Sequence, residues 1–229
     1  MSFGQGCRTY RDTAGNDNGH GDRTCSKGQH RRFHGRFAAC LKHRNGNIWL
    51  HLVSGVVQQI QIDADQQTTL LSRCPGLRNI IQWLDSIDRR PGLSELESKL
   101  SSQEFEINAL RDCIGSTDDG YQRNVIKRTQ HYEIVAICWR PGQLTPIHDH
   151  KGSDCAFLIL EGVSTERIFE IDQLGKAVHT STRHYSPGEI CAAEEPDIHQ
   201  VVNEQESELV NLHIYTPPLS EFMIYAPAE

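Results

Sequence analysis

The amino-acid sequence predicts an α+β fold that is mainly β, with an antiparallel β-barrel core preceded by a few short helices. Apolar residues recur at three- and four-residue spacing across residues 77–87, which is the period of an amphipathic helix. After Gly120, short runs rich in Ile, Val and aromatic residues are separated by Gly, Pro and Asp, as in strands joined by turns. Several strands without helical runs between them favour an antiparallel barrel or sandwich.

The helices are predicted from apolar spacing and from the residues that interrupt it. Ile80, Ile81, Leu84 and Ile87 mark the first helix, and the Arg-Pro-Gly sequence at residues 90–92 ends it. A second helix is expected after Ser94 and a third within residues 104–113. The clearest strands are expected at residues 131–139, 155–160, 164–171 and 208–215.

The chain is expected to divide into a disordered basic arm at residues 1–45, an extension of uncertain structure at 46–76, and a globular domain at 77–229. Residues 1–44 hold nine Lys or Arg against three Asp, and they lack the periodic apolar positions that offset chain entropy. A basic arm can contact nucleic acid or a membrane surface. A solvated tail is the commoner role of such a segment, and it is the one we expect here.

Composition narrows the function classes. A net charge of −7 and a pI near 5.9 argue against a general nucleic-acid binder, so small-molecule partners are expected. The sequence holds eight cysteines but opens without an apolar stretch of signal-peptide length, which favours reduced thiols and a cytoplasmic location. No apolar run approaches the length of a membrane span, so neither a membrane nor nucleic acid is expected as a partner.

Two histidine segments form a candidate metal site. His148 and His150 lie two residues apart, so on a strand both imidazoles project to one face while Asp149 points away. His199 lies about fifty residues downstream, a distance that several barrel strands cover before the chain returns to the same place. The histidine pair alone is a weak signal, and the spacing of the whole set makes it stronger.

These segments resemble the two motifs of the cupin fold, a jelly-roll β-barrel. The first motif is matched by Gly142, His148, His150, Cys155 and Gly162, and the second by His199 and Asn203. Pro196, Asp197 and Ile198 stand where the second motif usually has a glycine. Cys155 replaces the glutamate that is the usual fourth ligand, which leaves three neutral imidazoles and an open metal face for anionic substrate ligands. Ligand type alone permits iron, zinc, copper or nickel.

Residues 77–220 resemble more specifically the cysteine dioxygenase family of thiol dioxygenases. The His-Asp-His sequence is followed by Cys155 at the family's spacing, Tyr121-Gln-Arg123-Asn124 matches its Tyr-x-Arg-Asn segment, and His213-Ile-Tyr215 precedes its Pro-Pro pair. The resemblance implies Fe(II) held by His148, His150 and His199, a substrate carboxylate bound by Arg123 beside Tyr121, and catalysis by Tyr215, His213 and Cys155. It also implies a monomer that converts cysteine and dioxygen to cysteine sulfinic acid in cysteine catabolism.

Three further features follow from the resemblance. In animal members the equivalents of Cys155 and Tyr215 become joined by a thioether bond, and this chain keeps both partners, whereas many bacterial members have Gly at the cysteine position. Asn211 stands where the family usually has the serine of a Ser-His-Tyr series, and an amide can still bond to an imidazole. The Thr216–Pro217 bond corresponds to the family's cis proline.

Two alternatives remain open at the level of sequence. Mercaptopropionate dioxygenase has the same three-histidine site but usually Gln at the position of Arg123, so Arg123 favours cysteine. A non-enzymatic cupin that senses a metal or ligand explains the histidines, but it gives no role to Arg123, His213 or Tyr215.

Overall fold

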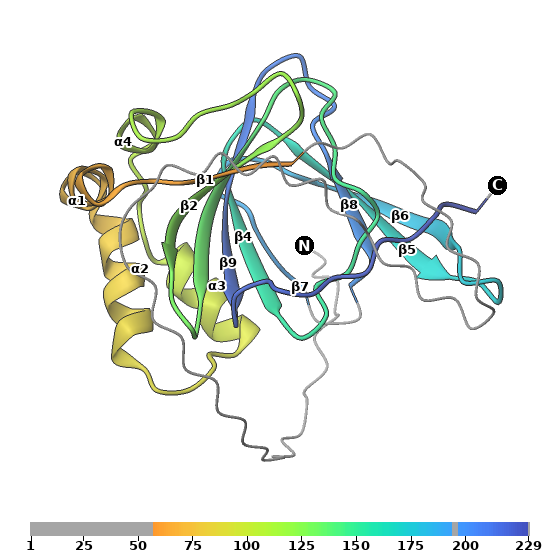
Figure 1. The fold of residues 1–229 in the computed structure, drawn as a ribbon, viewed down its shortest axis with the longest axis horizontal. Helices are drawn as coiled ribbons and strands as arrows, with labels where there is room; N and C mark the ends of the chain where they lie inside the picture. The colour runs from red at the N-terminus through yellow and green to blue at the C-terminus, as the bar shows by residue number, and fades with distance from the viewer. Residues whose placement is uncertain (1–56, 194–196, 229) are drawn as a thin grey trace, which may run out of the picture. The chain divides into compact units, whose positions relative to one another are not determined.

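The computed structural model describes residues 57–193 and 197–228. Within them the chain forms four helices and nine strands (Figure 1). The helices are α1 (Ala64–Arg73), α2 (Pro75–Ser86), α3 (Leu93–Ser101) and α4 (Ile107–Arg111). The strands are β1 (Gln58–Gln61), β2 (Gln122–Arg128), β3 (Glu133–Trp139), β4 (Asp154–Glu161), β5 (Ser164–Ile171), β6 (Ala177–Tyr185), β7 (Ile190–Ala193), β8 (His199–Val202) and β9 (Leu209–Thr216).

The strands form two sheets, and the predicted mainly-β jelly-roll fold is confirmed. One sheet has the order β1-β2-β3-β9-β4-β7 and the other the order β6-β5-β8. All pairings between strands are antiparallel except that of β1 with β2, which is parallel. The core is therefore two sheets rather than one continuously bonded barrel. Isolated bridges join the segment between β3 and β4 to β8, at Leu144↔Val202 and His148↔His199.

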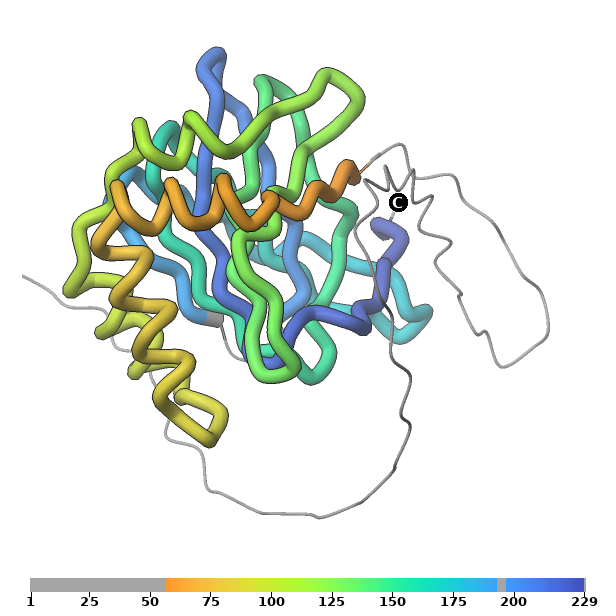
Figure 2. The backbone as a smooth tube through the Cα atoms, turned by 60° about the vertical axis from the view of Figure 1, so that its left-hand side comes forward, coloured from red at the N-terminus to blue at the C-terminus, as the bar shows by residue number. Residues whose placement is uncertain are grey.

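The helices cover one side of the larger sheet, where α2 and α3 lie beside its strands (Figures 1 and 2). Helix α1 begins with a capping box, in which Asp63 and Gln66 each accept a hydrogen bond from the other's backbone N–H. The apolar face of α2 is buried, as its spacing predicts. The core on this side contains Leu77, Ile80, Ile81, Leu84, Leu96, Leu100, Leu212 and Ile214.

Strand β9 separates this helix-side core from a second core between the sheets. Leu212 and Ile214 belong to the helix side, whereas Tyr215 belongs to the second core together with Cys155 of β4 and Val201 of β8. Alternation along the strand places His213 on the same face as Tyr215. The polar residues of β9 thus face the space between the sheets, and the helices protect the opposite face from water.

Two regular elements lie before residue 77, within the extension expected to be of uncertain structure. Strand β1 and helix α1 lie within residues 46–76, and β1 extends the larger sheet by pairing with β2. This part was missed because the short strand gains its stability from its neighbour rather than from its own periodicity. The expected arm at residues 1–45 lies outside the described residues.

Gly162 occupies the tight connection between β4 and β5. Its φ is +78°, and a Cβ at this position would lie 2.6 Å from the carbonyl oxygen of Glu208. Both the backbone conformation and the close approach require glycine, which gives the second glycine of the first histidine motif a structural reason. Among the described helices, none has the length and apolar character needed to cross a membrane.

Candidate metal centre

The three histidines of the two motifs come together in the structure. The candidate ligand atoms of His148, His150 and His199 all lie within 4.8 Å of one another, and their ring centroids are 4.7–5.1 Å apart. His148 and His199 exchange two backbone hydrogen bonds of 2.9 Å, so the first motif is held against β8. His148 and His150 lie between β3 and β4 rather than on a regular strand, yet the extended segment brings both rings to the same place.

Hydrogen bonds orient two of these rings. His148 has its Nδ1 atom 2.9 Å from the carbonyl oxygen of Pro146, and His199 has Nδ1 2.6 Å from Oδ2 of Asp197. Because the Nδ1 atoms are engaged in this way, Nε2 is the atom that each ring has available for a metal. Three imidazole donors at this spacing fit one metal ion.

Electrostatics favour the neutral, ligand form of two rings. Burial, followed by the neighbouring His199, lowers the pKa of His148 to about 3 and lowers the pKa of His150 well below its usual value. For His199, burial also acts to lower the pKa, but the hydrogen bond and charge of Asp197 and the charge of Glu166 outweigh it and raise the pKa. Two of the three imidazoles therefore resist protonation at neutral pH, which suits them to hold a cation.

His213, Tyr215 and Cys155 meet beside the histidine triad. Nδ1 of His213 lies 3.1 Å from the hydroxyl of Tyr215 and 3.6 Å from Sγ of Cys155. Cys155 is directly opposite Tyr215 in the pairing of β4 with β9, so both side chains share one face. The Tyr215 ring is 5.5 Å from the His150 ring, which connects this group to the candidate metal centre.

Burial keeps all three of these groups uncharged. It raises the pKa of Tyr215 and of Cys155 well above their usual values, and it lowers the pKa of His213, with the nearby Arg123 adding to that effect. Phe157 stacks on the His213 ring at 4.9 Å and restricts its orientation. The site thus offers a protonated phenol and a protonated thiol beside a neutral imidazole.

Arg123 projects from β2 into the same interior. Its Nη2 atom donates to Oε2 of Glu133 at 3.2 Å, its Nε to Oε1 of Gln59 at 3.3 Å, and its guanidinium lies 5.4 Å from the centre of the Tyr215 ring. Tyr121, the other expected substrate-binding residue, stacks on Trp139 at 4.4 Å and is largely buried. Arg123 therefore lies beside Tyr215, and Tyr121 belongs to the same core between the sheets as Tyr215 and Cys155.

Several side chains of the site were not singled out from the sequence. Asp197 and Glu166 lie beside His199, and Glu133 binds Arg123. Glu133 was detectable, because it alternates with Val135 and Ile137 and so belongs on the interior face of β3. Asp197 was detectable too, because it lies two residues before His199 and shares its side of an extended chain. The contact of Glu166 with His199, in contrast, arises from the pairing of β5 with β8.

Two expectations about β9 meet different outcomes. The Thr216–Pro217 bond is cis, as expected. Asn211 uses Oδ1 to accept a hydrogen bond of 3.1 Å from Nε1 of Trp139. The structure contains no direct hydrogen bond between Asn211 and His213 within its described residues, and both Nδ2 of Asn211 and Nε2 of His213 are buried without a partner.

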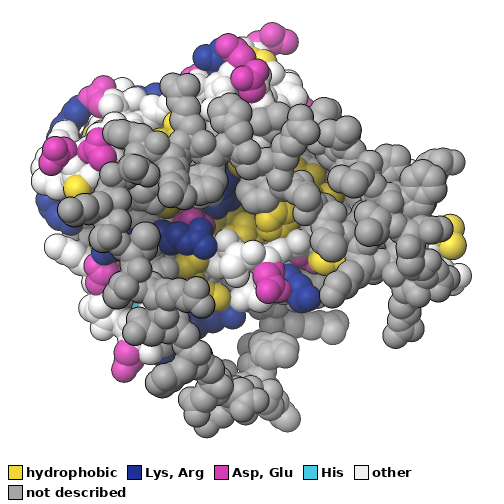
Figure 3. Space-filling model, viewed as in Figure 1, with side chains coloured by type: hydrophobic (Ala, Val, Ile, Leu, Met, Phe, Trp, Pro, Cys, Tyr) yellow, Lys and Arg dark blue, Asp and Glu magenta, His cyan; other side chains and the backbone are white. Residues whose placement is uncertain are grey.

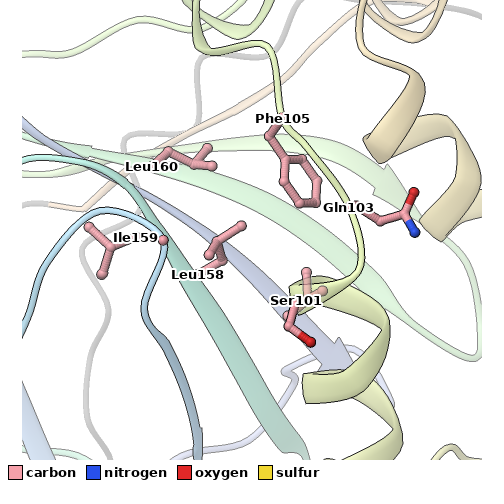
Figure 4. Close-up of a pocket in the computed structure, with 8 residues that line it drawn as sticks. Ser101, Gln103, Phe105, Leu158, Ile159 and Leu160 are labelled. Carbon is pink, nitrogen blue, oxygen red and sulfur yellow. The ribbon is translucent and has the colours of Figure 1, made fainter.

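A surface pocket lies away from the histidines. It has a volume of about 300 Å³ and lies beside α3 and β4, with Phe105, Leu158 and Leu160 among its lining residues (Figure 4). Its lining contains no titratable side chain, so it offers no group for acid, base or metal chemistry. On the face drawn in Figure 3, acidic and basic side chains are interspersed over the described surface.

Comparison with known proteins points to one family. The family model described as cysteine dioxygenase type I matches residues 94–227. Cysteine dioxygenase type 1 of Rattus norvegicus is 30% identical over 160 residues, which cover 66% of this chain and 80% of that protein. The enzyme of the same name from Homo sapiens is 29% identical over 103 residues, which cover 43% of this chain and 52% of that protein.

Solved structures of other proteins are more distant. A conserved protein with a double-stranded beta-helix domain from Klebsiella pneumoniae is 16% identical, with a TM-score of 0.44, and the match covers 54% of this chain and 92% of that one. The protein TT1209 from Thermus thermophilus is 22% identical, with a TM-score of 0.41, and the match covers 48% and 94% of the two chains.

Proposed function

Because the family model covers more than half of its length, this chain belongs to the cysteine dioxygenase type I family, and we propose that it oxidises L-cysteine with dioxygen to cysteine sulfinic acid. In this proposal His148, His150 and His199 hold Fe(II). The observation that carries the proposal is that three clustered imidazoles, a largely buried guanidinium and a buried phenol lie close together. A plain metal-binding cupin does not require the last two groups.

The proposed role of Arg123 is to bind the substrate carboxylate. A guanidinium has five N–H donors, and the hydrogen bonds to Glu133 and Gln59 leave donors for a further anion. The charge of Arg123 helps to lower the pKa of both His150 and His213, which supports a position of the guanidinium near both rings. A carboxylate bound there brings the thiol of the same small molecule towards the histidine triad.

The proposed role of Tyr215 is to donate a hydrogen bond to the reacting groups while His213 fixes the hydroxyl orientation. The raised pKa of Tyr215, which burial causes, keeps its proton in place at neutral pH. Iron, when bound, supplies one-electron chemistry with dioxygen and favours the thiolate form of the substrate. Closure of the space by two sheets limits water, which strengthens these polar interactions.

The reactants also suggest the compartment. The described cysteines, Cys74, Cys113, Cys138, Cys155 and Cys191, are all free. We infer a reducing compartment, in agreement with the cytoplasmic location expected from the sequence, because a thiol substrate and five free cysteines are both stable there.

The test is oxygen uptake by iron-loaded protein with cysteine and, separately, with 3-mercaptopropionate, followed by mass spectrometry of the products. We expect faster turnover of cysteine and formation of the sulfinic acid. Faster turnover of 3-mercaptopropionate would assign the other substrate, and no uptake with either thiol would favour a binding protein instead.

A pair of arginine variants tests the carboxylate site. Arg123→Gln should raise the KM for cysteine by about 10- to 100-fold, because each charge-assisted bond is worth roughly 1.5–3 kcal/mol. Arg128→Gln is the matched control: Arg128 binds the same Glu133 but is 41% exposed and lies outside the histidine site. An equal effect of the two substitutions would contradict the proposed role of Arg123.

A further inference from the structure

Two buried carboxylates lie on the side of His199 opposite its free nitrogen. Oδ2 of Asp197 is 2.6 Å from Nδ1 of His199, and Oε1 of Glu166 is 3.4 Å from the same atom. Asp197 is 8% exposed and Glu166 is fully buried. Carboxylates that are so well shielded from water are uncommon unless a partner compensates for the loss of hydration, and here the partner is the imidazole.

The sequence and the topology explain why these groups meet. Asp197 lies two residues before His199, so in an extended chain both side chains project to the same side. It occupies the place where the second histidine motif usually has glycine, a residue that has no side chain to offer. Glu166 comes from β5, where it pairs with Val201 of β8 and thus lies diagonally across from His199.

We propose that Asp197 is a positioning residue for the metal: it accepts the Nδ1–H of His199, directs Nε2 towards the ion, and adds negative charge behind an otherwise neutral ligand set. This inference rests on the proposed metal site of the three histidines. A carboxylate bonded to a ligating imidazole fixes its tautomer and raises its basicity. His199 is then a stronger donor than His148, whose Nδ1 faces only the carbonyl of Pro146.

The same atoms have a competing explanation as a second metal site. Glu166, Asp197 and His199 are close enough to hold an ion of their own. That arrangement would need both nitrogens of His199 to bind metals, and the 2.6 Å distance between Nδ1 and Asp197 is that of a short charge-assisted hydrogen bond. Glu166 is also engaged by the hydroxyl of Tyr185 at 3.2 Å and by Arg183 at 3.8 Å. Hydrogen bonding accounts for the cluster.

The experiment compares Co(II) affinity of metal-free wild type with that of Asp197→Asn and Asp197→Gly, by competition with a chelator. Asparagine keeps an acceptor oxygen without the charge, whereas glycine removes both. We expect Asp197→Asn to weaken binding and Asp197→Gly to weaken it further, within the 10- to 100-fold range typical of such partners. The visible absorption of bound Co(II) should shift in both variants, because the donor strength of one ligand changes.

Asp149→Asn is the matched control. Asp149 lies between two of the histidines, but its carboxylate accepts from the backbone N–H of Met223 and the hydroxyl of Tyr225 rather than from an imidazole. We expect Asp149→Asn to weaken Co(II) binding by less than about threefold, because no ligating imidazole loses a hydrogen-bond partner and salt screens the remaining effect of charge. Equal weakening in Asp149→Asn and Asp197→Asn would overturn the inference, because the effect would then be one of general charge.

The outcomes separate this inference from the function on which it depends. Failure of the wild type to bind Co(II) would refute the metal site itself. Tight binding by the wild type with an unchanged affinity and spectrum in both Asp197 variants would refute only the role of Asp197. Circular dichroism identifies any variant that is unfolded. If one Asp197 variant is unfolded, the reduction potential of iron bound to the other is compared with that of iron bound to the wild type. Loss of the carboxylate charge should make this potential more positive, and an unchanged potential would count against the proposal.

Discussion

The buried ion pair of Arg123 and Glu133 makes the stability of this domain sensitive to one isosteric substitution, Glu133→Gln. Glu133 is 0% exposed and accepts from Arg123 at 3.2 Å and from Arg128 at 3.0 Å. The Arg123 side chain is 11% exposed, so water can compensate little for a lost partner. Removing one member of a buried pair costs roughly 3–5 kcal/mol. Glutamine keeps one acceptor oxygen, so we expect the lower end, about 3 kcal/mol.

For a domain of this size, that loss should lower Tm by about 6–12 °C. The measurement is thermal and urea unfolding followed by circular dichroism. Glu161→Gln provides the control, because Glu161 binds Arg111 with 47% of its side chain exposed, and such surface pairs contribute less than about 1 kcal/mol. A Glu133→Gln protein as stable as the control would refute the argument that burial makes this pair important.

The same variant links stability to substrate binding. An anion bound to Arg123 would replace the lost charge of Glu133, so saturating cysteine under anaerobic conditions should raise the Tm of Glu133→Gln more than that of the wild type. Equal increases would indicate that the substrate carboxylate binds elsewhere.

Three further predictions concern other parts of the domain. Burial acts to raise the pKa of Asp85, but hydrogen bonds from a lysine and a tyrosine hydroxyl outweigh it and lower the pKa below 3.8. Asp85 therefore stabilises the fold fully when the pH is above the pKa that Asp85 has in the unfolded chain, and this stabilisation is lost as the pH falls through the lowered pKa of the folded protein. Urea titrations should show a free energy of unfolding that is higher for the wild type than for Asp85→Asn, by an amount that is constant near neutral pH and shrinks below about pH 4. During turnover, dioxygen of the proposed reaction should accept the two electrons and two protons released when the Sγ–H of Cys155 and a ring C–H of Tyr215 are replaced by a C–S bond. The intact mass should then fall by two hydrogen atoms, and Cys155→Ser should show no such species. Asn211→Leu should destabilise the fold by roughly 1–3 kcal/mol in urea, because it leaves the buried N–H of Trp139 without an acceptor; an unchanged midpoint would contradict this.

Much of the candidate site could be predicted from local sequence. The spacing of His148 and His150 needs only an extended backbone to bring both rings to one place, and the alternation of His213 with Leu212 and Ile214 assigns it to the face opposite the helices. These are short-range rules, in which the side-chain direction follows from the position along the strand. The fold class followed in the same way from runs of strand residues separated by turns.

The strands of weak periodicity were harder to predict. Strand β6 is mostly exposed, β7 and β8 have four residues each, and β1 pairs in parallel with β2. Such strands are stabilised by hydrogen bonds to a neighbour that lies far away in the sequence, so their own residues contain little signal. The register of those pairings decides which side chains reach the interior.

The sequence by itself determined the two histidine motifs, the alternation of β9 and the mainly-β class, because each depends on residues that are close along the chain. Only the tertiary structure decided that Glu166 of β5 flanks His199 and that Glu133 pairs with Arg123. The physical reason is that the charge environment of a buried group is set by whatever the folded chain brings within a few ångströms of it, and strand order and register are cooperative properties of the whole sheet.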